Sequence, residues 1–94
     1  MKITKFDLGF MSVTMGVKLD DGIFSRVPSI LRRHRNCDYG DIPKEDAAAN
    51  DFALRSLSGR VVSSYRVQAK KVLVITDGLG TDDVSTMVLL PKEY

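Results

Sequence analysis

One short run of residues constrains the fold of this chain more than any other feature. Residues 72–76 are apolar without alternation, the pattern of a central strand that is covered on both faces. The flanking residues 61–67 alternate with a period of two, and residues 85–90 alternate weakly before Pro91. The connections between these three segments are short enough for hairpins, so we expect an antiparallel meander.

The first half of the chain predicts one further strand and two helices. Residues 8–14 are rich in β-branched and aromatic residues and favour a strand. Apolar residues recur at spacings of three and four over residues 23–33, which predicts a short helix with Pro28 in its first turn or at a kink. A second helix is predicted to be capped by Asp41 and to end near Leu57. The order is β-α-α-β-β-β, an α+β fold in which two helices pack on one face of an antiparallel sheet.

Length and charge narrow the classes of protein to which the chain can belong. Its 94 residues are expected to form a single globular domain over residues 1–94. A formal charge of +2 is too small to require a nucleic-acid or membrane partner by itself. The longest apolar runs, residues 72–75 and 87–90, are far shorter than the roughly 20 residues that cross a bilayer. We therefore expect no membrane association.

The single cysteine indicates the compartment. Cys37 has no second cysteine with which to form an intramolecular disulfide or a Cys-x-x-Cys pair, which favours a reducing environment. The first seven residues interrupt their apolar positions with charge and lack the apolar core of a signal peptide. We expect a cytoplasmic protein.

The only histidine, His34, is the one candidate for proton transfer. Asp38 or Asp41 would have to orient its ring. A helix-end histidine bonded to a nearby carbonyl is the competing interpretation, since the neighbouring arginines disfavour a protonated ring. A zinc site built on His34 and Cys37 would lack the usual four ligands. No G-x-S-x-G elbow is present, so we expect no enzyme, no metal and no cofactor.

Two clusters of opposite charge stand out. The arginines of residues 32–35 could contact phosphates with steep salt dependence, or simply complement a helix dipole as a solvated face. The aspartates of residues 77–83 could hold a hard cation, although their spacing is not that of an EF-hand and a solvated turn explains them as well. The candidate partner contacts in these clusters are Arg32, Arg33, Arg35, Asp77, Asp82 and Asp83.

The loop between the two predicted helices is a further candidate binding element, through Asp38, Tyr39 and Asp41. It also has a structural interpretation. Its polar groups would satisfy N–H groups at the start of the second helix, and Tyr39 would pack on the sheet and bond through its hydroxyl. Asn50 lies in an apolar stripe and would tie this loop to the helix by bonds from side chain to backbone.

Several motifs together resemble a known family. They are the Asp-Tyr-Gly-Asp loop at residues 38–41, Asn50, the Ser-Tyr pair at residues 64–65, and the terminus Leu-Leu-Pro-Lys-Glu-Tyr at residues 89–94. The chain resembles small proteins carried by plasmids, integrative elements and phages, often labelled only as plasmid-related proteins. The resemblance implies no reaction. It implies an accessory or anti-defence factor, such as an inhibitor of CRISPR or restriction systems, that occupies a surface of a larger complex.

The leading hypothesis is a non-enzymatic protein of a mobile element that acts by protein–protein contact on a host protein complex. Such binding needs an interface of only about 800 Å² per partner. The alternative is a nucleic-acid-binding accessory protein that uses the basic cluster of residues 32–35. A small hydrolase or nuclease is a third hypothesis, and it would require His34 together with Asp38 or Asp41.

Overall fold

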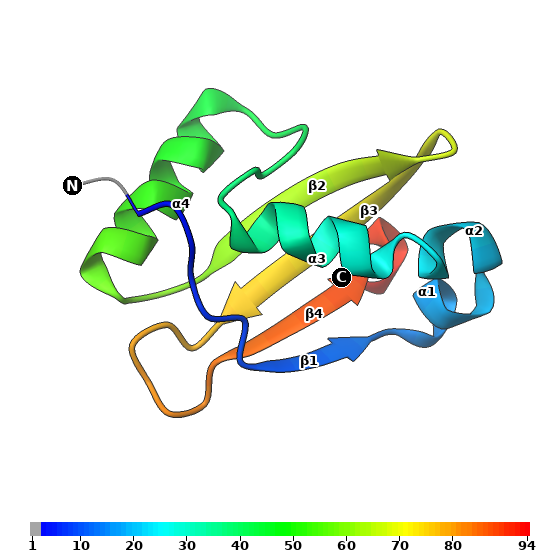
Figure 1. The fold of residues 1–94 in the computed structure, drawn as a ribbon. Coiled ribbons are helices and arrows are strands. Elements are labelled where there is room, and N and C mark those ends of the chain that lie inside the picture. Colours follow the sequence, from blue (N-terminus) through cyan, green and yellow to red (C-terminus); the bar gives the residue numbers. More distant parts are fainter. Residues whose placement is uncertain (1–2) are drawn as a thin grey trace.

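The computed structural model describes residues 3–94, in which a strand and a helical segment precede three further strands (Figure 1). This order confirms the α+β class and the predicted strands. In chain order the elements are β1 (Phe10–Val13), α1 (Met15–Leu19), α2 (Asp21–Phe24), α3 (Val27–Arg35), α4 (Lys44–Ser56), β2 (Val61–Val67), β3 (Lys70–Asp77), β4 (Ser85–Leu89) and the 3-10 helix η1 (Pro91–Glu93).

The strands form one mixed sheet in the order β1-β4-β3-β2. β3 pairs antiparallel with both β2 and β4, which confirms the predicted meander. β1 pairs in parallel with β4, placing Phe10 beside Ser85 and Val13 beside Val88, so the expectation of a wholly antiparallel sheet is wrong. A hairpin forces neighbouring strands to be antiparallel, whereas β1 reaches β4 only through the rest of the chain, and a long crossover permits parallel pairing.

The helix predicted over residues 23–33 is divided in two. α2 ends at Phe24 and α3 begins at Val27, with Pro28 in the first turn of α3, where its missing N–H removes no helical hydrogen bond. The sequence does not predict α1, because residues 15–19 lie in a stretch whose composition favours a strand.

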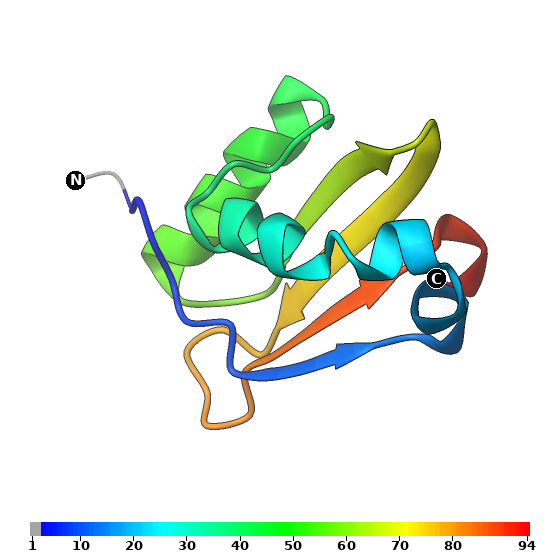
Figure 2. The same cartoon turned by 45° about the vertical axis from the view of Figure 1, so that its right-hand side comes forward.

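The main core lies between α3 and one face of the sheet, and α3 crosses that face in both views (Figures 1 and 2). Val27 and Ile30 of α3 belong to the same buried cluster as Val72 of β3. A second, smaller core contains Leu54 of α4 and Val61 of β2. α3 therefore covers the middle of one face of the sheet, and α4 packs at the start of β2.

α4 lies beside the β2 edge of the sheet. The side-chain amide of Asn50 donates to the Val62 carbonyl at 2.9 Å, and its oxygen accepts from the Val62 N–H at 3.0 Å. These bonds place α4 along the edge of β2. Leu54 of α4 also packs with Val61, whose side chain lies on the same side of β2 as Tyr65 of the main core. α4 therefore contacts the face of the sheet that α3 covers and also reaches over the β2 edge. Pro43 rather than Asp41 occupies the N-cap, and the helix ends as predicted, with Leu57 in the left-handed region at a φ of 50°.

The face of the sheet opposite α3 is largely open. Phe10 is 75% exposed and Met87 is 44% exposed, and Leu73 and Ile75 of β3 are only half-buried. The expectation that residues 72–76 are covered on both faces is therefore wrong for the described part of the chain. An apolar run predicts a strand, but it does not distinguish a covered apolar face from an exposed one. Within residues 3–94, no helix is long and apolar enough to span a membrane.

Candidate functional site

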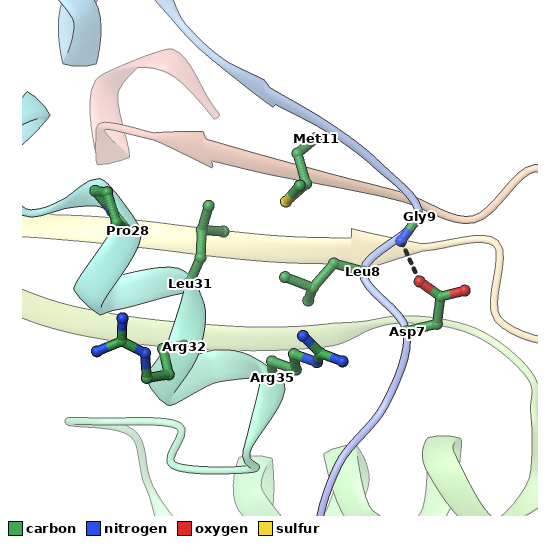
Figure 3. A pocket seen from close by; sticks show the side chains of 8 residues that line it. All are labelled: Asp7, Leu8, Gly9, Met11, Pro28, Leu31, Arg32 and Arg35. Atoms are coloured by element: carbon green, nitrogen blue, oxygen red, sulfur yellow. Dashed lines mark hydrogen bonds between the residues drawn. The ribbon is translucent and has the colours of Figure 1, made fainter.

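The arginines of α3 point in different directions. Three positions separate Arg32 from Arg35, so the helical period places both on one face, whereas Arg33 is turned by about 100° from Arg32. Arg32 and Arg35 line a hollow between α3 and the chain that enters β1 (Figure 3). The guanidinium carbon of Arg33 lies instead 4.7 Å from the centre of the Tyr65 ring. The predicted basic cluster is thus divided between two sides of the helix.

The hollow between α3 and β1 combines an apolar part with a basic part. It has a volume of about 370 Å³, and in Figure 3 the side chains of Leu8, Met11 and Leu31 converge on it. At one end the Asp7 carboxylate accepts a hydrogen bond from the Gly9 N–H at 2.9 Å. We call this hollow the α3–β1 groove; its apolar and basic lining consists of Leu8, Met11, Pro28, Leu31, Arg32 and Arg35.

Among the described residues, no acidic side chain pairs with the two arginines of the groove. None of the ion pairs formed within residues 3–94 involves Arg32 or Arg35. A guanidinium offers five N–H donors in a planar fork that fits a carboxylate or a phosphate. The groove therefore presents two unneutralised positive groups beside an apolar surface.

Arg33 is already engaged within the molecule. Its Nε lies 2.7 Å from Oδ2 of Asp38 and its Nη2 lies 3.2 Å from Oδ1, a two-point pairing. The hydrogen bond with Asp38 raises the pKa of Arg33, and the same bond lowers the pKa of the Asp38 carboxyl. Arg33 and Asp38 are consequently less available to a partner than Arg32 and Arg35.

The loop of residues 38–41 closes the edge of β2. The Ser64 N–H donates to the Tyr39 carbonyl at 3.0 Å, and the Asp41 N–H donates to the Ser64 carbonyl at 2.7 Å. Tyr39 is buried, as predicted, and its hydroxyl donates to the Asp51 carboxylate at 2.7 Å. Burial raises the pKa of Tyr39, and the bond to Asp51 adds to this shift. The Asp41 carboxylate lies on the surface, 3.7 Å from the Arg66 guanidinium.

Asn50 also closes the β2 edge, through the two bonds to Val62 described above. The sequence predicts bonds from Asn50 to the loop, and this partner is wrong. The outward N–H and C=O groups of both Val62 and Ser64 are therefore bonded, at an edge that would otherwise expose them.

The aspartates of the loop after β3 do not form one cluster. Asp77 pairs with Arg60 at 3.0 Å. Asp82 and Asp83 line a separate hollow of about 510 Å³ that also borders Asp7 and Phe10. Among residues 3–94, no three acidic, histidine or cysteine side chains are grouped to hold a metal ion.

His34 lies in the core rather than at a surface site. It is fully buried, with Nδ1 2.5 Å from the Ser63 hydroxyl and Nε2 2.8 Å from the Thr76 hydroxyl. Its expected partners lie elsewhere, since Asp38 pairs with Arg33 and Asp41 lies near Arg66. The predicted bond to a nearby carbonyl is also wrong, because the ring bonds to hydroxyls of β2 and β3.

The hydrogen bonds around His34 fix which nitrogen carries the proton. The Leu8 carbonyl only accepts, so the Thr86 hydroxyl donates to it, at 2.7 Å. The Thr76 hydroxyl must then donate to Thr86, at 2.6 Å, and accept from Nε2–H of His34. Nδ1 is left as the acceptor for Ser63. Burial lowers the pKa of His34 to about 4, consistent with this neutral ring.

The sequence predicts the arginines of the groove as a candidate site but not its apolar part. Leu8 and Met11 come from the chain around β1, far from α3 in sequence, and only the fold brings them beside Leu31. The sequence does contain one indication of this apolar part, because residues 10–13 lie in a predicted strand and include no charged residue.

Comparison of the chain with protein-family models, curated proteins and solved structures gave no match.

Proposed function

We propose that this protein is a non-enzymatic binding protein that acts by protein–protein contact through the α3–β1 groove. The single observation that carries the proposal is the position of Arg32 and Arg35, without acidic partners, beside the apolar surface of Leu8, Met11 and Leu31. Protein interfaces commonly combine an apolar centre with arginine contacts.

The division of the arginines favours a protein partner over nucleic acid. A surface that follows a phosphate backbone needs several cations on one side. Here the arginines are divided between two hollows. Arg32 and Arg35 lie in the groove, with the Asp7 carboxylate at its end. The other arginines line a separate hollow, in which Arg33 is paired with Asp38 and Arg66 lies near Asp41; they are Arg26, Arg33 and Arg66.

Burial of His34 supports a function without catalysis by this residue, because a fully buried ring does not contact a substrate. We propose the cytoplasm as the compartment, which the single cysteine supports. On the family resemblance alone, we propose a complex of the host's defence systems as the partner.

Selection from a displayed library of random peptides tests the groove without a known partner. We expect the enriched peptides to combine apolar residues with aspartate or glutamate. The double variant Arg32→Ala/Arg35→Ala should bind them at least about tenfold more weakly, since two charge-assisted contacts are lost. Arg55→Ala removes an exposed arginine of α4 and is the matched control, expected to bind normally.

Two results would overturn this function. One is equal binding of the enriched peptides by the double variant and the wild type. The other is binding of duplex or single-stranded DNA that falls steeply with salt and is lost in the double variant, which would assign the same arginines to nucleic acid.

A further inference from the structure

The two edges of the sheet differ in how they are protected. At the β2 edge, Asn50 bonds the backbone of Val62, and the loop of residues 38–41 bonds the backbone of Ser64. At the β1 edge, β4 is the only strand that pairs with β1 in the described part of the chain. One edge is sealed at two consecutive outward positions, and the other is open.

The register of β1 shows which of its backbone groups face outward. The Phe10 N–H donates to the Val84 carbonyl and the Thr14 N–H donates to the Val88 carbonyl, both at 3.0 Å. Because backbone groups alternate sides along a strand, Met11 and Val13 direct their N–H and C=O groups away from β4. These two residues offer two donors and two acceptors to a further strand.

The side chains of β1 lack the features that usually protect an edge. The sequence of β1 is Phe-Met-Ser-Val, without lysine, proline or any charge. Phe10 is 75% exposed and Met11 is 53% exposed, and Met11 also lines the α3–β1 groove. Proteins commonly blunt open edges with charge, proline or a covering segment, and an unprotected edge is a template for pairing.

We infer that the β1 edge binds an extended acidic segment of a partner protein as a fifth strand, an inference that rests on the proposed function of the groove. The backbone of the segment pairs with Met11 and Val13. Side chains on one of its faces lie beside Met11 in the groove, where Arg32 and Arg35 receive carboxylates. This mode of binding takes affinity from the backbone and specificity from alternate side chains.

The groove charge selects an acidic partner over a second copy of this chain. Pairing of two β1 strands would bring a second set of the same arginines to the shared edge. Like charges that face each other across an interface oppose association, whereas carboxylates complement Arg32 and Arg35.

The test uses a labelled ten-residue peptide of alternating valine and glutamate, with a valine and lysine peptide as the charge control. Two further versions carry N-methyl groups on the nitrogens of only the valines or only the glutamates. In a strand, the N–H groups of all the valines point to one edge and those of all the glutamates point to the other edge. Only one of these edges can face β1. We therefore expect one methylated peptide to bind at least about tenfold more weakly and the other to bind normally.

Protein variants test the same contacts from the other side. Met11→Pro removes one outward N–H at an exposed edge position, where proline is tolerated, and should weaken binding at least about tenfold. Met11→Ala keeps the N–H but removes most of the side chain that lines the groove, so it should weaken binding less than Met11→Pro does. Equal weakening by the two variants would contradict pairing with the Met11 N–H. Circular dichroism of Met11→Pro establishes that it is folded.

The outcomes separate this inference from the proposed function. Equal affinity of the two methylated peptides overturns the fifth strand, and loss of their binding in Arg32→Ala/Arg35→Ala would still support the groove. Weak binding by Met11→Pro with normal binding by the arginine double variant supports the strand and refutes the groove.

No binding of the glutamate peptide at about 1 mM, or equal binding of the lysine peptide, overturns the acidic partner. A dimer in sedimentation that Met11→Pro abolishes would assign the edge to a second copy and overturn the inference.

Discussion

Acidification should destabilise this protein through a single residue. His34 is the only histidine of the chain, is fully buried, and holds its neutral form between Ser63 and Thr76. Its pKa is lowered from 6.5 to about 4 by burial. The unfolded chain therefore binds a proton between these two pH values, and the folded chain does not. Stability from this residue is fully present above about pH 6.5 and is lost as the pH falls toward 4.

The size of the effect follows from this difference in pKa. For values of 6.5 and about 4, the linkage relation gives a loss of about 2 kcal/mol in the free energy of unfolding between pH 7 and pH 5. In a domain of this size that loss corresponds to a decrease in melting temperature of roughly 8–15 °C. Hydrogen bonds lower the pKa of the Asp20 and Asp38 carboxyls from the ordinary value of 3.8, and that of Glu93 from 4.5. The stability that these carboxylates contribute is therefore lost mainly below the interval from pH 5 to pH 7.

Urea unfolding of the wild type and of His34→Gln at several values between pH 5 and pH 7 measures the effect. Glutamine does not titrate, so the variant should be less stable at pH 7 but nearly independent of pH in this interval. Titration of the imidazole by NMR in the intact protein gives the folded pKa directly, even if the variant does not fold. A wild-type free energy of unfolding that is constant from pH 7 to pH 5, or an imidazole that titrates near 6.5, would refute the reasoning.

Two further predictions concern the sealed β2 edge, and thermal or urea unfolding checks both. Asn50→Ala leaves the N–H and C=O of Val62 without their partners and should lower the free energy of unfolding by about 1–3 kcal/mol. The control Arg55→Ala changes an exposed residue of the same helix and should alter stability by less than about 0.5 kcal/mol. Equal stability of the two variants would contradict the role of Asn50. Gly40 has a φ of +73°, and a Cβ there would lie 2.1 Å from the Ser64 carbonyl oxygen, so Gly40→Ala should cost more than about 3 kcal/mol. Gly59 is the matched control, because it has a φ of +87° but no atom lies within 4 Å of a Cβ built there. Gly59→Ala should therefore lower stability by only about 1–2 kcal/mol. Similar losses from the two glycine variants would show that the contact with Ser64 is unimportant.

The meander was predictable because it depends on sequence patterns within each strand and on the short connections between the strands. Residues 61–67, 72–76 and 85–90 carry strand patterns separated by short connections, and short connections determine antiparallel neighbours. The neighbour of β1 was not predictable, since four helices lie between β1 and the meander and no local sequence pattern indicates which strand of the meander pairs with β1. The positions of α1 and α4 depend in the same way on contacts made late along the chain.

The candidate site was predictable only in part. The three arginines are close in sequence and form one charged run, but the period of an α-helix separates Arg33 from Arg32 and Arg35. The partners of His34 and Asn50 depend on strand register. Ser63, Thr76 and Val62 gain their roles only when β2 and β3 pair, and a residue-by-residue pattern does not contain that pairing.

The parallel pairing of β1 with β4 also has a consequence for the order of folding. The Thr86 hydroxyl reaches the Leu8 carbonyl across 78 positions of sequence, whereas the contacts within the meander are between neighbouring segments. Closing long loops costs more entropy, and contacts distant in sequence form slowly. We therefore expect β1 to join the sheet after the meander has formed, and to be among the first elements to detach in local unfolding. A partner strand on β1 would hold in place the segment of the sheet that assembles last.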